Sequence, residues 1–170
     1  MRRMGDDRPA PRADRVTHRL FFLAVPLALA ACSDGRPAHR VASDAPLSKR
    51  LAGADADYGR QIFYRCAACH NMSEGAGDRN GPNLWGVLGR PVATGSQRFG
   101  YTGALKAFGG TWTCARLDEW LADPMRTVPG TQMTFGGLPD GADRADVIAW
   151  LARNGGVPAA ARCQGLRADR

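Results

Sequence analysis

Apolar residues recur at helical spacing in three separate stretches of the chain. They cover residues 55–65, residues 115–122, which end before a proline, and residues 144–153, which end at an Asn-Gly-Gly sequence. No stretch shows the strict alternation of apolar and polar residues that is typical of a strand, and no internal repeat is present. The pattern therefore predicts an all-α fold with three main helices.

Residues 71–110 are rich in glycine and turn dipeptides, and we expect mostly loop there, with a short helix at residues 102–107. A loop of about forty residues is unusual in a compact domain. Because a small domain has a small core, such a loop needs a large bound group to organise it.

The N-terminal region carries an apolar run, residues 20–31, preceded by arginines and too short to span a bilayer as a helix. It predicts an export signal over residues 1–31. Residues 29–32 (LAAC) resemble a bacterial lipobox, which predicts lipid on Cys32 as the mature N-terminus; the alternative is ordinary cleavage with Cys32 incidental.

The remaining boundaries follow from composition. Residues 32–54 are rich in Ser, Pro, Asp and Arg, which predicts a flexible tether. Residues 55–155 are expected to form the folded domain, and residues 156–170 a C-terminal tail.

Without residues 1–31, which hold six arginines and three aspartates, the net charge falls from +7 to +4. With no basic stripe among aromatic residues, this surplus does not indicate nucleic-acid binding.

Cys66, Cys69 and His70 form a Cys-X-X-Cys-His motif, the attachment site of c-type haem. Each cysteine can bond one haem vinyl group, and the adjacent histidine can then reach the iron. A redox-active Cys-X-X-Cys would need a βαβ context, and a zinc ribbon would need a second cysteine pair. Neither is present, so we expect one covalent haem c.

Over residues 55–153 the chain resembles class I c-type cytochromes. Gly59 and Phe63 resemble the helix-packing pair of that family, which implies contact with Val147 and Trp150 of the last helix. A Gly-Pro-Asn-Leu sequence begins 11 residues after His70 and places Pro82 12 residues after it. The resemblance implies the small cytochrome c fold, with the Pro82 carbonyl oxygen accepting a hydrogen bond from the iron-binding imidazole.

The resemblance also implies further haem contacts. Arg90, Tyr101 and Trp112 lie in segments like those that surround a haem propionate, although both aromatics would also suit an ordinary core. The loop that contains Thr131 and Met133 resembles the family's methionine-ligand loop, which implies Met133 as the second iron ligand. The alternative for Met133 is a core methionine.

Two cysteines remain, Cys114 and Cys163. In an oxidising compartment they can form a disulfide that holds the C-terminal tail; the alternative is two unpaired thiols.

These features predict an electron carrier rather than an enzyme. A methionine and a histidine would fill both axial positions of the iron, so no small-molecule substrate is expected. The chain would pass single electrons between redox proteins on the periplasmic side of a bacterial membrane, anchored by lipid or otherwise soluble. The alternatives are a haem subunit of a larger dehydrogenase or oxidase, and a peroxidase or gas sensor with an open iron position.

Overall fold

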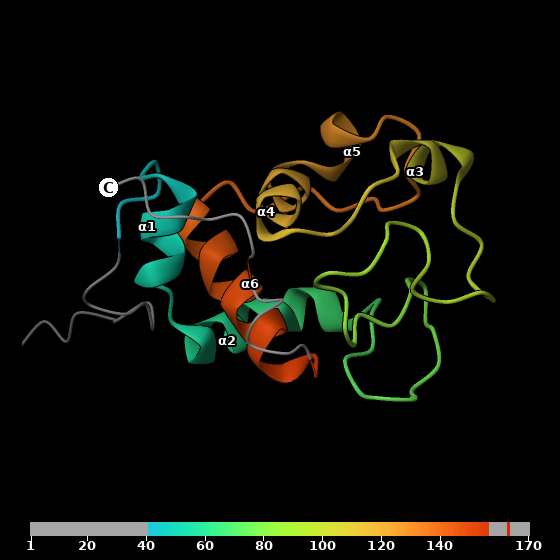
Figure 1. Ribbon diagram of the computed structural model, residues 1–170, viewed down its shortest axis with the longest axis horizontal. Coiled ribbons are helices and arrows are strands. Elements are labelled where there is room, and N and C mark those ends of the chain that lie inside the picture. Colours follow the sequence, from blue (N-terminus) through green and yellow to red (C-terminus); the bar gives the residue numbers. More distant parts are fainter. Residues whose placement is uncertain (1–40, 157–162, 164–170) are drawn as a thin grey trace, which may run out of the picture. The chain divides into compact units, whose positions relative to one another are not determined.

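The computed structural model describes residues 41–156 and residue 163, and within these residues it contains helices and no strand. Three helices are longest, as Figure 1 shows: α2, α4 and α6. The helices are α1 (Leu47–Ala52), α2 (Ala56–Ala67), α3 (Gly103–Phe108), α4 (Cys114–Ala122), α5 (Pro124–Thr127) and α6 (Gly141–Asn154). The prediction of an all-α fold is confirmed. The long segment between α2 and α3 is irregular, and its residue Pro91 forms an isolated bridge with Thr111, which follows α3.

Side-chain caps determine where most of these helices begin. In each case an oxygen of the capping residue accepts a hydrogen bond from a backbone N–H of the first turn. The capping residues are Asp55, Thr102, Thr113, Asp123 and Asp140. The cap at Asp140 starts α6 three residues earlier than apolar spacing predicted, and the cap at Asp123 starts the additional short helix α5.

The core forms where α6 crosses α2. A Cβ atom added at Gly59 would lie 2.0 Å from the carbonyl oxygen of Asp146, so only glycine allows the two backbones to approach this closely. One turn later, the rings of Phe63 and Trp150 lie 4.2 Å apart between centroids. The predicted contact between these two helix faces is therefore present, and it holds the end of α2 in place.

The structure departs from the predicted flexible tether over residues 47–52. These residues form α1, which packs against α6. Their sequence has little apolar periodicity because the buried side chain that holds the helix is a charged one, Arg50, which is only 7% exposed. A buried charge requires paired partners, and these lie far away in the sequence.

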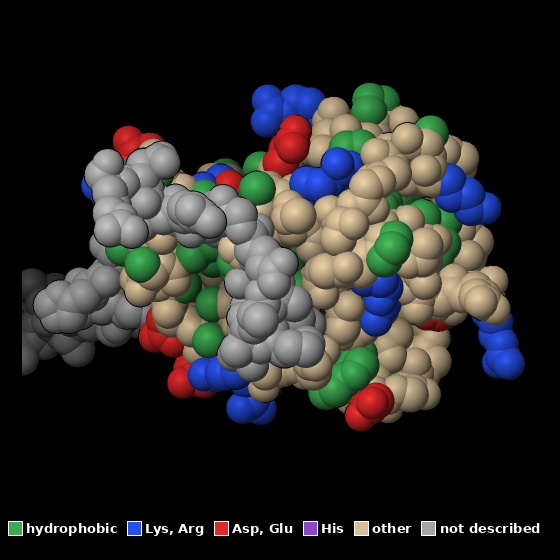
Figure 2. Space-filling model, viewed as in Figure 1, with side chains coloured by type: hydrophobic (Ala, Val, Ile, Leu, Met, Phe, Trp, Pro, Cys, Tyr) green, Lys and Arg blue, Asp and Glu red, His purple; other side chains and the backbone are tan. Residues whose placement is uncertain are grey.

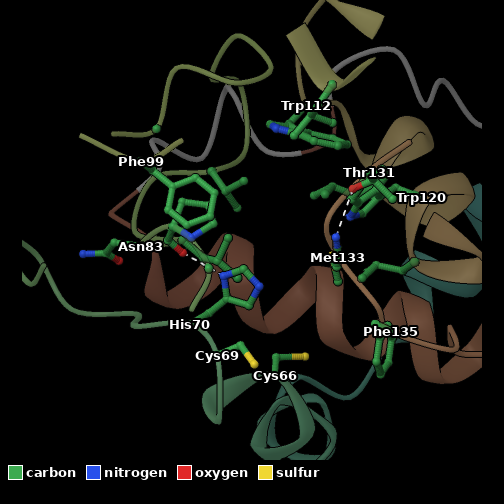
Figure 3. A pocket seen from close by; sticks show the side chains of 18 of the residues that line it. Cys66, Cys69, His70, Asn83, Phe99, Trp112, Trp120, Thr131, Met133 and Phe135 are labelled. Carbon is green, nitrogen blue, oxygen red and sulfur yellow. Dashed lines mark hydrogen bonds between the residues drawn. The ribbon is translucent and has the colours of Figure 1, made fainter. Parts of the chain in front are cut away.

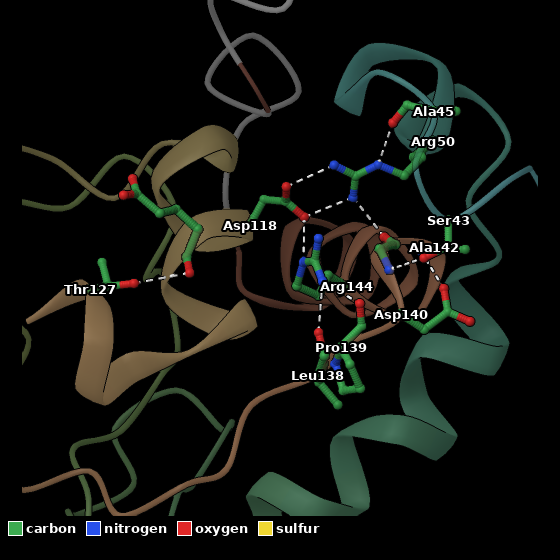
Figure 4. Close-up of polar contacts among 12 residues, drawn as sticks. Ser43, Ala45, Arg50, Asp118, Thr127, Leu138, Pro139, Asp140, Ala142 and Arg144 are labelled. Atoms are coloured by element: carbon green, nitrogen blue, oxygen red, sulfur yellow. Dashed lines mark hydrogen bonds and ion pairs between the residues drawn. The ribbon is translucent and has the colours of Figure 1, made fainter.

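Arg50 is paired with Asp118 of α4 (Figure 4). Its two terminal nitrogens donate to the two carboxylate oxygens at 2.8 and 2.7 Å, and Nη1 also donates to the carbonyl oxygen of Gly141. Arg144 of α6 donates to Asp118 Oδ1 from its other side at 2.8 Å. One carboxylate thus joins α1, α4 and α6 through two guanidinium groups.

Asp118 is expected to make the fold less stable in acid. Burial alone raises the pKa of Asp118, but the hydrogen bonds from Arg50 and Arg144 outweigh burial and hold that pKa below its ordinary value of 3.8. Because the folded-state pKa is the lower one, the stabilisation is complete above the unfolded-state pKa and is lost as pH falls through the folded-state pKa. Denaturant titrations at about pH 7 and about pH 3 measure this loss.

Asp118→Asn should reduce the free energy of unfolding at neutral pH and lose less of it in acid than the wild type does. Glu119→Gln, a change at the exposed neighbouring position on α4, is the control and should keep the wild-type pH dependence. An equal loss of stability in acid for the Asp118→Asn variant and the wild type would contradict this prediction.

Several predicted features lie wholly or partly outside the described residues. These are the export signal over residues 1–31, the lipid site at Cys32, the first part of the tether over residues 32–54, and most of the tail over residues 156–170. No described helix is both long and apolar enough to cross a bilayer. On the face of the described residues that Figure 2 shows, Lys and Arg side chains are scattered among acidic and apolar ones and form no continuous stripe.

Candidate functional site

The Cys-X-X-Cys-His motif lies at the end of α2. Cys66 is within the last turn of the helix, and the backbone N–H groups of Cys69 and His70 both donate to the Cys66 carbonyl oxygen, at 3.0 and 2.9 Å. This extra turn brings both thiols and the imidazole to the edge of one cavity (Figure 3). The two cysteines are not bonded to each other, and burial raises the pKa of the Cys66 thiol to about 11.

The imidazole of His70 is held by the loop that follows. Its Nδ1 donates to the carbonyl oxygen of Pro82 at 2.7 Å, as the resemblance implied. A Cβ atom added at Gly81 would lie 2.3 Å from Cε1 of the ring, so only glycine allows the loop to run this close to the imidazole. Burial lowers the pKa of His70 more than the Pro82 hydrogen bond raises it. The ring is thus neutral at neutral pH, and its Nε2 lone pair remains for a metal.

The cavity has a volume of about 390 Å³ and mostly apolar walls. It is lined by residues of the helices α2, α3, α4 and α6, of the long loop, and of the segment that follows α5. The apolar wall residues include Phe63, Leu84, Val87, Phe99, Leu105, Leu117, Trp120, Leu121, Val147 and Leu151. Such walls keep water away from whatever the cavity holds, and they lower the local dielectric constant.

Met133 lies across the cavity from His70 (Figure 3). Its backbone N–H donates to the Thr131 hydroxyl at 3.2 Å, and the Thr131 N–H donates to the Val128 carbonyl oxygen at 3.0 Å. The turn places Met133 at the cavity wall. The structure therefore places the two residues that the sequence predicted as iron ligands on facing sides of the same cavity.

The three predicted propionate partners, Arg90, Tyr101 and Trp112, also line the cavity. A Cβ atom added at Gly95 would lie 2.7 Å from Arg90 Nη1 and 2.9 Å from the Tyr101 hydroxyl, so these two polar groups converge on one glycine. Arg90 donates to the Trp85 carbonyl oxygen, and burial raises the pKa of Tyr101, which remains protonated at neutral pH. A cation and a phenol thus converge at one wall of an otherwise apolar cavity, which suits an acidic group on a bound molecule.

The residues present fit a covalently attached haem. Two thiols adjoin a neutral histidine at one edge, a soft thioether faces that histidine, and cationic and hydroxyl donors stand at another wall. Haem needs thiols for its vinyl groups, one or two axial ligands, and partners for its propionates.

The sequence predicted no role for three residues that contribute to the site: Asn83, Phe135 and Gly95. Asn83 ties the histidine loop together, because its side-chain amide donates to the carbonyl oxygens of Ser73 and Ala76. Phe135 lies at the cavity beneath Arg65, whose guanidinium is 5.4 Å from the ring centroid. The signal for Phe135 was its position two residues after Met133; Gly95 carried no signal at all.

Cys114 and Cys163 form a disulfide in the structure, with Cα atoms 4.9 Å apart. Cys114 is the first residue of α4, the helix that supplies Leu117, Trp120 and Leu121 to the cavity. The bridge therefore attaches a residue of the C-terminal tail to a wall of the site.

Comparison with known proteins identifies the family. The family model for cytochrome c matches residues 56–154. A cytochrome c homolog from Bradyrhizobium diazoefficiens is 41% identical over 110 residues, which are 65% of this chain and 60% of that protein. Cytochrome c2 from Rhodoblastus acidophilus is 43% identical over 99 residues, 58% of this chain and 92% of that protein.

A solved structure also matches the fold of this chain. Cytochrome cH from Methylobacterium extorquens is 41% identical, with a TM-score of 0.55, and the match covers 59% of this chain and 99% of that one. The predicted resemblance and the small cytochrome c fold are therefore confirmed. This chain belongs to the cytochrome c family, whose members carry one covalently attached haem c and are electron carriers, not enzymes.

Proposed function

We propose that this chain is a single-haem c-type cytochrome that passes one electron at a time between redox proteins. The observation that carries the proposal is that His70 and Met133 face each other across one apolar cavity, with Cys66 and Cys69 at its edge. Haem c supplies an iron that alternates between the ferric and ferrous states.

The chain's own residues have distinct tasks in this proposal. The thiols of Cys66 and Cys69 each form one thioether bond and fix the group at the end of α2. The Pro82 carbonyl oxygen accepts a hydrogen bond from His70, which fixes the ring orientation and makes the imidazole a stronger ligand. Met133 supplies a thioether, a soft ligand that favours ferrous iron and raises the reduction potential.

Little rearrangement is needed when the charge changes. The turn at Thr131 and the glycine loop at Gly81 hold Met133 and His70 from separate segments, so both residues would remain ligands of the iron in either charge state. Arg90, Tyr101 and Trp112 would surround a propionate, while the apolar walls exclude water. These properties suit electron transfer and leave no iron position for a substrate.

Visible spectra and a redox titration of the haem-loaded protein test the proposal. We expect a one-electron transition, a low-spin c-type spectrum with the weak ferric band of methionine ligation, and no response to carbon monoxide. High-spin features or ready carbon monoxide binding would mean an open iron position and would move the assignment to a peroxidase or gas sensor.

We further propose that the protein is exported and anchored by lipid on Cys32. The support is the sequence pattern: arginines, an apolar run over residues 20–31, and LAAC at residues 29–32. A lipid chain and a short linker would keep the carrier at the periplasmic side of a membrane, where haem attachment to c-type cytochromes also takes place.

Cys32→Ser is expected to abolish lipid attachment and membrane anchoring, because a serine hydroxyl cannot replace the thiol that accepts the lipid. Fractionation of cells, followed by haem staining, measures the distribution, and mass spectrometry of the N-terminus checks for lipid. Ser33→Ala, which keeps the cysteine, is the control and should stay with the membrane. Membrane association of the Cys32→Ser variant equal to that of the control would contradict the lipid anchor.

The partners would be an electron donor and an electron acceptor that are themselves redox proteins. On the face that Figure 2 shows, the scattered charges do not favour a single highly charged partner surface. Isolation of the anchored protein from membranes distinguishes a free carrier from a subunit: a fixed ratio of one co-purifying dehydrogenase or oxidase would indicate the subunit.

A further inference from the structure

The segment of residues 41–53, which we call the N-terminal clamp, precedes the region that the family model matches. It is nevertheless docked on that region. The Ser43 hydroxyl accepts a hydrogen bond from the backbone N–H of Gly141 at 2.7 Å, and Arg50 is buried against α4 and α6 (Figure 4). The clamp is thus held at the start of α6 by two separate contacts.

On one side the clamp reaches a wall of the cavity through α4. Arg50 holds both carboxylate oxygens of Asp118, at 2.8 and 2.7 Å. The neighbouring residues Leu117 and Trp120 line the cavity. Because α4 is a short helix, fixing one of its side chains restrains the position of the others.

On the other side the clamp reaches the segment that carries Met133. Arg144, which shares Asp118 with Arg50, donates from Nη1 to the carbonyl oxygens of Leu138 and Pro139 at 2.7 and 3.0 Å. The Leu138 N–H in turn donates to the Leu121 carbonyl oxygen at 2.7 Å. The chain after Met133 is therefore fixed to α4 and α6 at the same point where the clamp docks.

The charges explain why Arg50 matters at this point. The side chains of Arg50, Asp118 and Arg144 are 7%, 15% and 13% exposed, so their attraction is only weakly screened by water. Without Arg50, the Asp118 carboxylate retains only Arg144 among the side chains of the described residues that donate to it. Arg144 must then satisfy both the carboxylate and the two carbonyl oxygens. A guanidinium that can shift toward Asp118 holds Leu138 and Pro139 less firmly.

We propose that the N-terminal clamp is a positioning device for Met133, in which Arg50 fixes Asp118 and Arg144 and thereby holds the segment 131–139 against the cavity. This inference rests on the proposed function, in which Met133 is an iron ligand. Arg50 is a positioning residue, since it touches neither the cavity nor Met133. The clamp makes Met133 harder to displace from the iron by a competing ligand.

Imidazole, which competes with methionine for ferric haem, is the probe. We would titrate the haem-loaded full chain and follow the loss of the weak ferric methionine band. Arg50→Gln is expected to bind imidazole about fivefold or more tightly than the wild type, within the usual range of coupling between sites. Arg50→Lys keeps the charge but not the paired contacts, so its imidazole affinity should lie between those of the wild type and Arg50→Gln. It is the variant to use if Arg50→Gln does not fold.

Arg153→Gln is the matched control. It removes an ion pair between Arg153 of α6 and Asp57. The two side chains are exposed, Arg153 by 46% and Asp57 by 82%. It should leave imidazole affinity at the wild-type value. If Arg50→Gln binds imidazole within about twofold of this control, the clamp has no effect on Met133 and the proposal is overturned, whatever the change in overall stability.

Hydrogen exchange separates failure of the clamp from failure of the haem ligation. The Leu138 amide should exchange faster in Arg50→Gln than in Arg153→Gln, and an unchanged rate would overturn the clamp irrespective of the iron ligand. If the wild-type spectrum lacks the methionine band, the ligand assignment fails, and with it the role of the clamp in iron ligation, even where Leu138 responds.

Discussion

Met133→Ala is expected to turn a haem protein that ignores carbon monoxide into one that binds it. The thioether lies across the cavity from His70, and alanine cannot reach the position that it leaves. The iron would then carry one protein ligand, and a diatomic molecule could take the other position. Visible spectra of the reduced variant with and without carbon monoxide measure the change, together with loss of the ferric methionine band.

The reduction potential should fall in the same variant, because the ligand that favours ferrous iron is lost. Met125→Ala is the matched control: Met125 belongs to α5, lies eight residues earlier in the chain and is 54% exposed. It should keep the wild-type spectrum and potential. Carbon monoxide binding by both variants, or by neither, would show that Met133 does not hold the iron.

Gly59→Ala is expected to prevent stable folding of the haem-loaded protein or to destabilise it severely. The added methyl group would lie 2.0 Å from the carbonyl oxygen of Asp146 and 3.0 Å from the Val147 nitrogen, which are backbone atoms and cannot rotate away. Overpacking of a core costs about 1–3 kcal/mol and occasionally more, and a backbone clash belongs at the upper end. Denaturant unfolding followed by haem absorbance measures the loss.

Gly103→Ala provides the control for this experiment. Gly103 is also helical, as the first residue of α3, and nothing lies within 4 Å of an added Cβ atom. Alanine there should be neutral or slightly stabilising, by up to about 1 kcal/mol, because glycine loses more chain entropy in a helix. Equal stability of the two variants would show that α2 and α6 can separate without consequence.

Much of the site could be predicted because its chemistry is local. Cys66, Cys69 and His70 lie within a single turn, so their spacing alone places three groups on one edge. Met133 is 63 residues from His70, and it was predicted only through the resemblance of its loop to a known one. No rule of spacing could have placed it across the cavity, because that position depends on how α4 and α6 pack.

The N-terminal clamp shows why the rest could not be predicted. The Ser-, Pro-, Asp- and Arg-rich composition of residues 32–54 predicts a flexible tether, and nothing in that composition sets residues 47–52 apart. Arg50 becomes a buried structural residue only because Asp118, 68 positions later, comes within hydrogen-bond distance. Helix α5 was missed for a different reason: its proline ends α4, and the carboxylate of Asp123 caps a new turn over only four residues, too short to show apolar periodicity.

The sequence by itself determined the helical class and the haem attachment motif, and its resemblance to a known family implied the hydrogen bond between His70 and Pro82 and the glycine of the helix crossing, Gly59. Each of these depends on groups that are close in the chain or on a steric requirement that only one residue type meets. Tertiary structure decided that Arg90 and Tyr101 converge on Gly95, which of the two alternatives holds for Cys114 and Cys163, and that Arg50 pairs with Asp118, which Arg144 joins to the carbonyl oxygen of Leu138. The disulfide and the Arg50–Asp118 pair join residues far apart in the chain, and their free energy exists only once packing has brought the partners together and excluded water from between them.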